Sequence, residues 1–335
     1  MIENFVCFYS SCPFWAGQPI NLEDPENLKN LRELITEVVF RYESDAFRLW
    51  VCRDGMLMLQ IYELEAAKPD EEGDELVNWI AWWEQYLNHF NCLYLLLDAC
   101  LIEVLKLGYI KLSEVTNKDV FRLRVVDGKI LGCETFATES ITSVFQLDRF
   151  YSSVFPQNTQ FNVRLITRRA FPKEVFDKLA AKFSVVLTHK ELVSRLSVIA
   201  KSISEYKVGN FPISLILSWF IIELVVTEKW ERFLDSKNQA YEDGSKRISA
   251  DRRKILTGLI SAISNILELA DSIQYELFKK IDAVRGYRNK VIHKDSGYVC
   301  QPEHCRLALE TALDLTLEGH PLQVTLNMGY SVPGP

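Results

Sequence analysis

The sequence predicts an α+β domain followed by an all-α helical bundle. Two pairs of β-rich runs flank Asp-Gly turns in the first part of the chain, whereas helical periodicity dominates from about residue 171 onward. Residues 1–150 hold 13 basic and 25 acidic side chains, and residues 151–335 hold 25 and 20. We therefore expect an acidic domain over 1–170, a helical bundle over 171–325 and a flexible tail over 326–335.

The composition is that of an ordinary globular protein. Of 335 residues, 48% are hydrophobic and 25% are charged, which excludes a disordered or collagenous chain. The formal net charge of −7 argues, as a global figure, against nucleic-acid binding, but it is the sum of −12 and +5 for the two parts. The sign of the charge is therefore informative only for each part separately.

Cysteine spacing and the N-terminus predict a cytoplasmic location. The eight cysteines show no regular framework spacing, which favours reduced thiols. The chain starts Met-Ile-Glu-Asn, with an acid where a signal peptide carries basic residues. The apolar stretches Cys92–Leu107 and Phe211–Val226 are shorter than the ~20 residues of a membrane span and contain acids, so we expect buried helices and no membrane partner.

The first domain is expected to contain two β-hairpins and a long helical segment. Phe47–Leu64 and Val120–Phe136 each have β-rich runs around an Asp-Gly pair, which favours a two-residue turn. Glu75–Gly108 has helical spacing without an internal Pro or Gly, and predicts one helix or two. No phosphate-binding glycine motif occurs, so the residues leave the role of this domain, sensory or regulatory, open.

An aromatic stripe lies at helical spacing within that segment. Trp79, Trp82, Trp83 and Tyr86 occupy positions i, i+3, i+4 and i+7. We expect a helix face packed on the core, with a base-stacking or ligand platform as the alternative.

The second domain is expected to consist of helices joined by short polar segments. Phe211-Pro212 places a proline in a first turn, and Gly319 follows the last helix as a stop signal. The predicted helices are Pro172–Lys182, Lys190–Tyr206, Phe211–Asp235, Ser249–Ala270, Ser272–Lys294 and Pro302–Leu317.

The most chemically suggestive segment is Glu276–Asp295, which has six basic and three acidic residues. At ~100° per residue, Asn289 and His293 share a helix face. Arg288 lies about 140° from His293, so its side chain must curl toward the histidine if the two are to act together. One helix thus carries a guanidinium, an amide and an imidazole close together.

These residue types suit phosphodiester chemistry. Arginine can grip a phosphate bidentately and stabilise the extra charge of the transition state. Histidine can move the proton of a ribose 2′-OH or of the leaving oxygen, so a site of this kind without metal ligands suggests RNA as substrate. The structural alternative is a surface or capping histidine beside a solvated arginine.

Arg288-Asn289-x-x-x-His293, late in a helix of a four- to five-helix bundle, resembles the R-x4–6-H signature of the HEPN superfamily, over residues 171–325. The resemblance implies a metal-independent endoribonuclease whose two motifs meet across a homodimer, and it implies prokaryotic antiviral defence, abortive infection or toxin activity. Arg288 would then stabilise the phosphorane, His293 would handle the proton and Asn289 would orient the phosphate or the histidine. Neither metal nor cofactor is expected.

Several other residues are candidates for supporting roles. Glu223, inside an apolar helix, is a candidate supporting residue, or else a structural partner of a buried base such as Arg288; Arg285 lies one turn before Asn289. The candidate RNA-backbone contacts are Lys290, Lys294, Arg252 and Arg253, with Arg164, Arg168 and Arg169 inviting the same interpretation.

Zinc binding is not favoured. Cys300, His304 and Cys305 could ligate zinc, but no fourth ligand lies at a convincing spacing, so we expect structural thiols and a surface histidine.

Two other functions remain open at this point. A HEPN-like bundle could instead be a non-catalytic module that binds nucleotide, RNA or a protein. A toxin paired with a nucleotidyltransferase antitoxin would carry or receive a nucleotide on His293 or on a tyrosine such as Tyr298. If the helical domain is a nuclease, with or without an antitoxin, the acidic domain would sense a trigger or regulatory ligand, restrain the nuclease or select the RNA.

Overall fold

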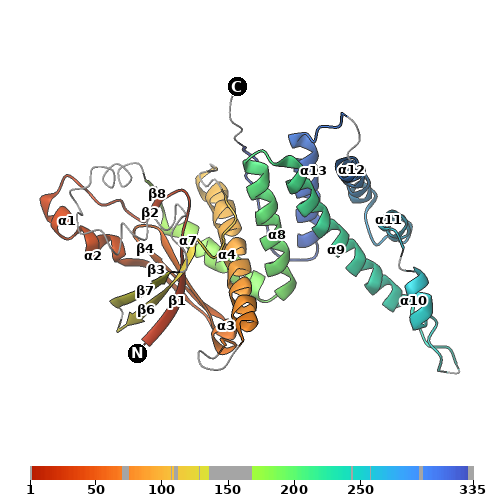
Figure 1. Cartoon of the computed structure of the whole chain (residues 1–335), viewed down its shortest axis with the longest axis horizontal. Helices are drawn as coiled ribbons and strands as arrows, with labels where there is room; N and C mark the ends of the chain where they lie inside the picture. Colours follow the sequence, from red (N-terminus) through yellow and green to blue (C-terminus); the bar gives the residue numbers. More distant parts are fainter. Residues whose placement is uncertain are drawn as a thin grey trace. The chain divides into compact units, whose positions relative to one another are not determined.

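A computed structural model of the chain describes residues 2–69, 75–106, 108, 112–127, 129–135, 168–242, 244–256, 258–293 and 297–330. An antiparallel sheet with helices is followed by an all-helical region, so the predicted fold class is confirmed (Figure 1). The chain forms two compact units, Met1–Ala200 with Leu322–Gly329 and Lys201–Pro321 with Tyr330–Pro335. The division falls at residue 200, whereas the sequence predicts 170.

The first unit is built on a six-stranded antiparallel sheet of order β3-β4-β5-β1-β6-β7. Both predicted hairpins, β4–β5 and β6–β7, are present, whereas the central strand β1 and the edge strand β3 were not predicted. A short parallel pair, β2 and β8, lies outside this sheet. The strands are β1 (Ile2–Tyr9), β2 (Phe14–Ala16), β3 (Val38–Glu43), β4 (Phe47–Cys52), β5 (Met56–Ile61), β6 (Val120–Val126), β7 (Lys129–Thr135) and β8 (Arg169–Phe171).

The turn between β4 and β5 depends on a glycine. Gly55 has φ +87°, and a Cβ at this position would lie 2.8 Å from the backbone oxygen of Phe14. The Asp54-Gly55 signal therefore marks a position where both the backbone conformation and the available space require glycine.

Several helices accompany the sheet in the described part of the first unit. They are α1 (Pro25–Lys29), α2 (Leu31–Thr36), α3 (Tyr62–Ala66), α4 (Leu76–Leu105), α7 (Lys173–Leu187), which packs on α4 and β3, and the part of α8 (Lys190–Lys207) up to Ala200. Because α7 packs there, the segment after residue 170 belongs to the first unit rather than to the bundle.

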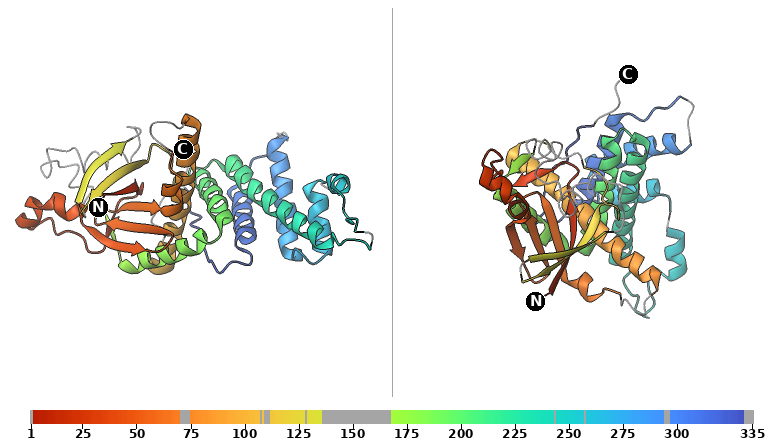
Figure 2. Two further views of the ribbon diagram at one scale, coloured as in Figure 1. Left: turned by 90° about the horizontal axis from the view of Figure 1, so that it is seen from below. Right: turned by 60° about the vertical axis from the view of Figure 1, so that its left-hand side comes forward.

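Aromatic contacts join the sheet to α4 and α7, which lie against one of its faces (Figure 2). Phe8 of β1 contacts the ring of Tyr94 at a centroid distance of 5.0 Å, and Phe47 of β4 contacts Phe183 at 5.1 Å. Because side chains alternate along a strand, Phe5 and Trp50 point to the opposite face and pack together at 4.6 Å. Both faces of the sheet therefore carry apolar clusters.

The aromatic stripe of α4 is divided between core and surface. Trp82 and Tyr86 are buried, and the indole of Trp82 donates a hydrogen bond to the backbone oxygen of Leu64 at 2.7 Å. Trp79 and Trp83 are half-buried. The expected packing role holds for the two buried members.

A surface ion-pair cluster links α4 to α7 and predicts a pH-dependent stability. Lys178 donates to Glu103 at 2.6 Å and Lys182 lies 3.2 Å from the same carboxylate, which together lower the pKa of Glu103. The stabilisation is present above the unfolded pKa of about 4.5 and is lost as the pH falls through the lower folded value. Glu103→Gln is expected to reduce the free energy of unfolding by at most about 1 kcal/mol near pH 7.

Urea unfolding of the wild type and of Glu103→Gln at about pH 7 and about pH 3 measures this difference. The gap is expected to shrink at the lower pH, and a gap of equal size at both pH values would contradict the assignment.

The second unit contains the helices of the predicted bundle. They are the end of α8 (Lys190–Lys207), α9 (Phe211–Lys237), α10 (Ala250–Leu256), α11 (Ile260–Leu269), α12 (Tyr275–Ile292) and α13 (Pro302–Leu317). The predicted bounds of the last helix are those observed. The predicted helix Ser249–Ala270 is instead two helices with Gly258 between them, because glycine destabilises a helix interior.

Packing in this unit centres on α9, which contacts α11, α12 and α13. Ser202 of α8 makes hydrogen bonds to Ser214 and to Ser218 of α9, the latter at 2.8 Å, so small polar side chains join the two helices here. Within the predicted tail, residues 326–330 are described and form neither helix nor strand, while 331–335 lie outside the described residues.

The two longest helices among the described residues each contain a long apolar stretch. By length and composition, α4 and α9 could each cross a membrane, although 67% of the most apolar window of α4 and 44% of that of α9 are buried within the protein. A buried core helix meets the same criteria, so the expectation of buried helices fits α4 better than α9.

Candidate functional site

The candidate site lies at the C-terminal end of α12. Ile281 and Val284 are buried and hold the helix against the bundle. The helix ends at Ile292, and the backbone N–H of His293 caps it by donating to the oxygen of Asn289 at 2.9 Å.

Arg288 lies in the interface between α12 and α9. Its Cζ is 6.0 Å from the ring centroid of Trp219 on α9, and its Nη1 donates to Oδ1 of Asn289 at 3.1 Å. The Nε atom is buried without a hydrogen-bond partner among the described residues, and no carboxylate there pairs with this guanidinium. Arg288 is thus a half-buried cation in the described structure, and some of its N–H donors have no partner there.

The guanidinium of Arg288 contacts the neighbouring amide of Asn289 and the indole of Trp219. No hydrogen bond joins it to the imidazole of His293 in the described residues. The contact expected if the two side chains acted together is therefore not seen within one chain. Contact with a flat indole explains the observed direction, because it buries the apolar face of the guanidinium.

His293 and Asn289 differ in their exposure to solvent. His293 is exposed and Asn289 is half-buried. Because the Asn289 oxygen accepts from Arg288, its NH₂ group remains as a donor. An exposed imidazole, an amide donor and a guanidinium therefore lie within two turns of one helix end.

Glu223 lies one turn after Trp219 on α9, on the same side of the helix as the ring that Arg288 covers. It is half-buried, and no ion pair joins it to Arg288 in the described residues. The structural pairing with a buried base, expected as an alternative, is thus not present there.

Some of the other basic residues that the sequence suggests are already paired with acidic side chains, and others are accessible. Arg285 is paired with Asp282 of its own helix at 2.7 Å, and Arg253 of α10 is paired with Glu231 and Asp235 of α9. Their charges are therefore already balanced within the chain.

Among the remaining basic candidates, Lys290 is exposed with its Nζ 5.6 Å from the ring of Tyr298, and Arg252 is exposed. Arg168 is buried in the first unit, where it donates to the backbone oxygen of Asp54 at 2.9 Å, so a backbone contact to RNA is not available to it. Lys294 and Arg164 lie outside the described residues.

Cys300, His304 and Cys305 lie at the start of α13, where His304 and Gln301 form the cap of the helix. The Nδ1 atom of His304 accepts from the backbone N–H of Gln301 at 3.1 Å and from the hydroxyl of Tyr298 at 3.0 Å. Its ring stacks on Tyr287 at 4.0 Å. Among the described residues, no group of three or more His, Cys, Asp or Glu side chains is arranged to hold a metal ion.

Tyr298 is held as a protonated phenol. Burial is the main cause that raises its pKa, and its hydroxyl donates to His304. A phenol in this state is a weak nucleophile, so the geometry does not favour Tyr298 as an acceptor of a nucleotide.

Sequence reasoning missed Trp219 as a member of the site. The signal available was its position four residues before Glu223 in an apolar helix, which places the indole and the carboxylate on one face. Its role as the surface that receives Arg288 depends on packing between two helices distant in sequence.

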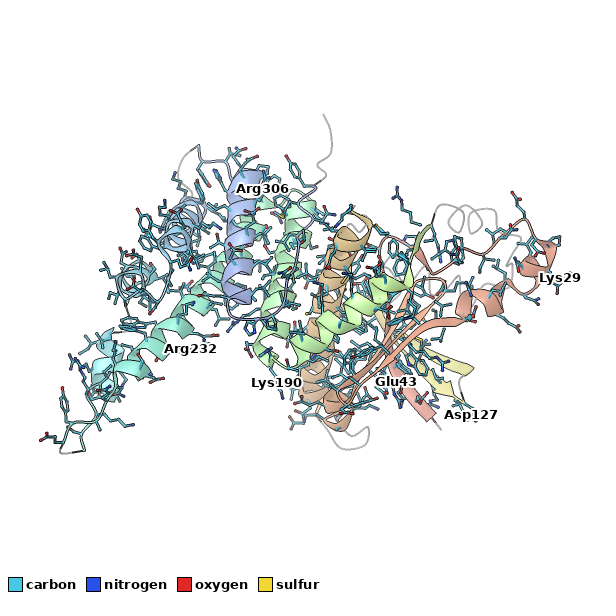
Figure 3. The ribbon with its side chains drawn as sticks, turned by 180° about the vertical axis from the view of Figure 1, so that it is seen from behind. Lys29, Glu43, Asp127, Lys190, Arg232 and Arg306 are labelled. Carbon is cyan, nitrogen blue, oxygen red and sulfur yellow. The ribbon has the colours of Figure 1, made fainter. Side chains whose placement is uncertain are left out.

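The first unit contains a cavity of about 450 Å³ whose lining includes Gln85, Asn88 and His89 of α4 and Lys190, which is labelled in Figure 3. Nδ1 of His89 lies 2.7 Å from the backbone oxygen of Gln85 and must carry the proton, so Nε2 is an acceptor in the neutral ring. Burial lowers the pKa of His89 and keeps it neutral. The cavity is large enough for a small regulatory ligand.

No family model matches the chain, and neither a curated protein nor a solved structure is similar to it.

Proposed function

We propose that the chain is a metal-independent endoribonuclease of the HEPN type, acting as a cytoplasmic homodimer in prokaryotic antiviral defence, abortive infection or toxin activity. The observation that carries the proposal is the half-buried Arg288, which lacks an acidic partner among the described residues and lies beside Asn289 and the exposed His293. A cation in such surroundings is costly unless an anion satisfies it.

A phosphodiester fits the donors that this site offers. The guanidinium can present a planar fork to two phosphate oxygens, and the Asn289 NH₂ group adds a third donor on the same helix end. Lys290 and Arg252 are exposed and supply further positive charge for an RNA backbone.

The reaction would proceed by attack of a ribose 2′-OH on the adjacent phosphorus. One imidazole takes the 2′ proton, the bond from phosphorus to the 5′ oxygen breaks, and a protonated imidazole gives a proton to that oxygen. The products are a 2′,3′-cyclic phosphate and a 5′-OH end. Because Arg288 does not contact His293 of its own chain, a second copy of the chain would supply the complementary group.

The face of α9 next to Trp219 supports a homodimer. Ile213, Ile216, Phe220 and Leu224 recur at spacings of three and four residues and form an exposed apolar stripe, with Phe220 56% exposed. The angular separation between this stripe and Trp219 is about one third of a helix turn, so a partner seated on it would lie beside Arg288.

Phe220→Glu is expected to convert the dimer into a monomer and to abolish RNA cleavage, because it places a charge in the apolar stripe of both copies. Size-exclusion chromatography with light scattering measures the mass, and Glu228→Ala on the same helix is the control. A dimer that persists in Phe220→Glu with full activity would contradict this interface.

The direct test of the proposal is cleavage of a fluorescent single-stranded RNA in the presence of EDTA. The wild type is expected to cut and His293→Ala is expected not to cut. Equal cleavage by both proteins, or no cleavage by the wild type with any trigger tried, would overturn the nuclease proposal.

A non-catalytic HEPN-like module that binds RNA or nucleotide is the second candidate. It is favoured by the absence of a contact between Arg288 and His293 in the described chain. Salt-sensitive binding of RNA that is lost in Arg288→Ala, without cleavage, would identify this function instead.

The cavity beside His89 is where a regulatory ligand would act on the first unit. An antitoxin partner is expected only if the protein acts as a toxin or in antiviral defence.

A further inference from the structure

Two cysteines lie in contact at the start of α13. Their Sγ atoms are 3.6 Å apart, and both side chains are buried, Cys300 8% exposed and Cys305 not at all. Gln301 is the N-cap of the helix, so Cys300 occupies the position before the cap and Cys305 the fourth helical position. These two positions commonly pack together at helix starts, which explains the contact.

The two thiols differ in acidity. The close contact between the two sulfurs, within hydrogen-bond distance, is the main cause that lowers the pKa of Cys300. The same contact and burial raise the pKa of Cys305. Cys300 is therefore the thiol that ionises first and acts as the nucleophile, while Cys305 remains a thiol next to it.

Burial alone does not produce this difference. Cys92 and Cys100 are also buried, and burial raises the pKa of each of these thiols. Cys300 differs from these two buried cysteines because its pKa is lowered and another thiol, that of Cys305, lies 3.6 Å away.

We propose that Cys300 and Cys305 form an oxidisable dithiol that hydrogen peroxide converts into an intramolecular disulfide. The Cys300 thiolate attacks one oxygen of the peroxide, the O–O bond breaks, and hydroxide leaves, which gives a sulfenic acid. The Cys305 sulfur then attacks the Cys300 sulfur, the S–O bond breaks, and the departing hydroxide takes the thiol proton as water. Two thiols and one peroxide thus give one disulfide and two waters.

The disulfide would alter the region between α12 and α13. The sulfurs must approach from 3.6 Å to about 2.05 Å. The Sγ atom of Cys305 lies 2.9 Å from the backbone oxygen of Phe211 at the start of α9, and in the disulfide it would have no proton to donate to that oxygen. Oxidation would therefore remove one link between α13 and α9 and add one between α13 and the segment that follows α12. This modification does not depend on the proposed nuclease function.

The test treats the reduced full-length protein with a small excess of hydrogen peroxide, then unfolds it and alkylates the remaining thiols. Peptide mass spectrometry is expected to find Cys300 joined to Cys305, with the other six of the eight cysteines alkylated. Dithiothreitol is expected to restore alkylation at both positions.

Two variants separate the steps. In Cys305→Ser, the sulfenic acid on Cys300 is expected to persist and to react with dimedone, whereas in Cys300→Ser, Cys305 is expected to stay reduced. Cys12→Ser, in the first unit, is the matched control and is expected to oxidise like the wild type. Full alkylation of both thiols after peroxide treatment, or pairing of Cys300 with another cysteine, would overturn the proposal.

Discussion

His293→Ala is expected to lower the rate of RNA cleavage by about 10²–10⁴ under single-turnover conditions, which is the range that a positioned acid or base contributes. The imidazole is exposed at the end of α12, and the cap of the helix uses the backbone N–H of this residue rather than its side chain. The substitution is therefore expected to leave the thermal unfolding midpoint nearly unchanged.

The unfolding measurement separates a chemical role from a structural one. A loss of cleavage in His293→Ala with an unchanged unfolding midpoint supports proton transfer by this residue. A retained rate, within about threefold of the wild type, would show that His293 is the exposed capping histidine of the structural alternative.

Arg288 is expected to give the second-largest effect. Arg288→Ala should lower the cleavage rate by about 10²–10³, because a preorganised charge at the developing phosphorane is lost. Arg288→Lys should recover little, since an ammonium offers no planar fork to two phosphate oxygens. Single-turnover rates at saturating RNA measure the effect on the chemical step.

The structure also predicts the sign of the stability change. Arg288 forms no ion pair among the described residues and its Nε lacks a partner there, so truncation removes a poorly satisfied cation and should not lower the unfolding midpoint appreciably. Arg232, labelled on α9 in Figure 3, is exposed and paired with Glu228, and Arg232→Ala is the matched control with unchanged cleavage. A large loss of stability with normal cleavage in Arg288→Ala would instead assign a packing role against Trp219.

Turn and helix-start residues in the sequence predicted the β-hairpins and the start of the last helix, because a few neighbouring residues determine where these elements begin or end. The Asp-Gly pairs located both hairpins, because a tight turn requires unusual backbone angles at these positions. Pro302 predicted the start of the last helix to the residue. Long-range pairing was less accessible: β1 carries no turn signal of its own, and its place in the sheet depends on strands β5 and β6, which come later in the chain.

The candidate site was predicted in composition but not in arrangement. The spacing of Asn289 and His293 followed from helix geometry, whereas the direction of the Arg288 side chain depends on Trp219 of another helix. Arg285 and Arg253 are candidate contacts in the sequence, yet each is paired with an acid in the structure. Asp282 on the same helix pairs with Arg285, and Asp235 of α9 pairs with Arg253. Charge counts along the sequence do not reveal such pairings.

The identity of the cleavage products tests the central claim most directly. A single-stranded RNA and the same oligonucleotide with 2′-deoxyribose at the cut position are incubated with the wild type in EDTA, and the end groups are determined by mass spectrometry. The account predicts cleavage of the RNA with a 2′,3′-cyclic phosphate and a 5′-OH end, and no cleavage at the deoxyribose. Cleavage at the deoxyribose, or a requirement for a divalent metal, would contradict it.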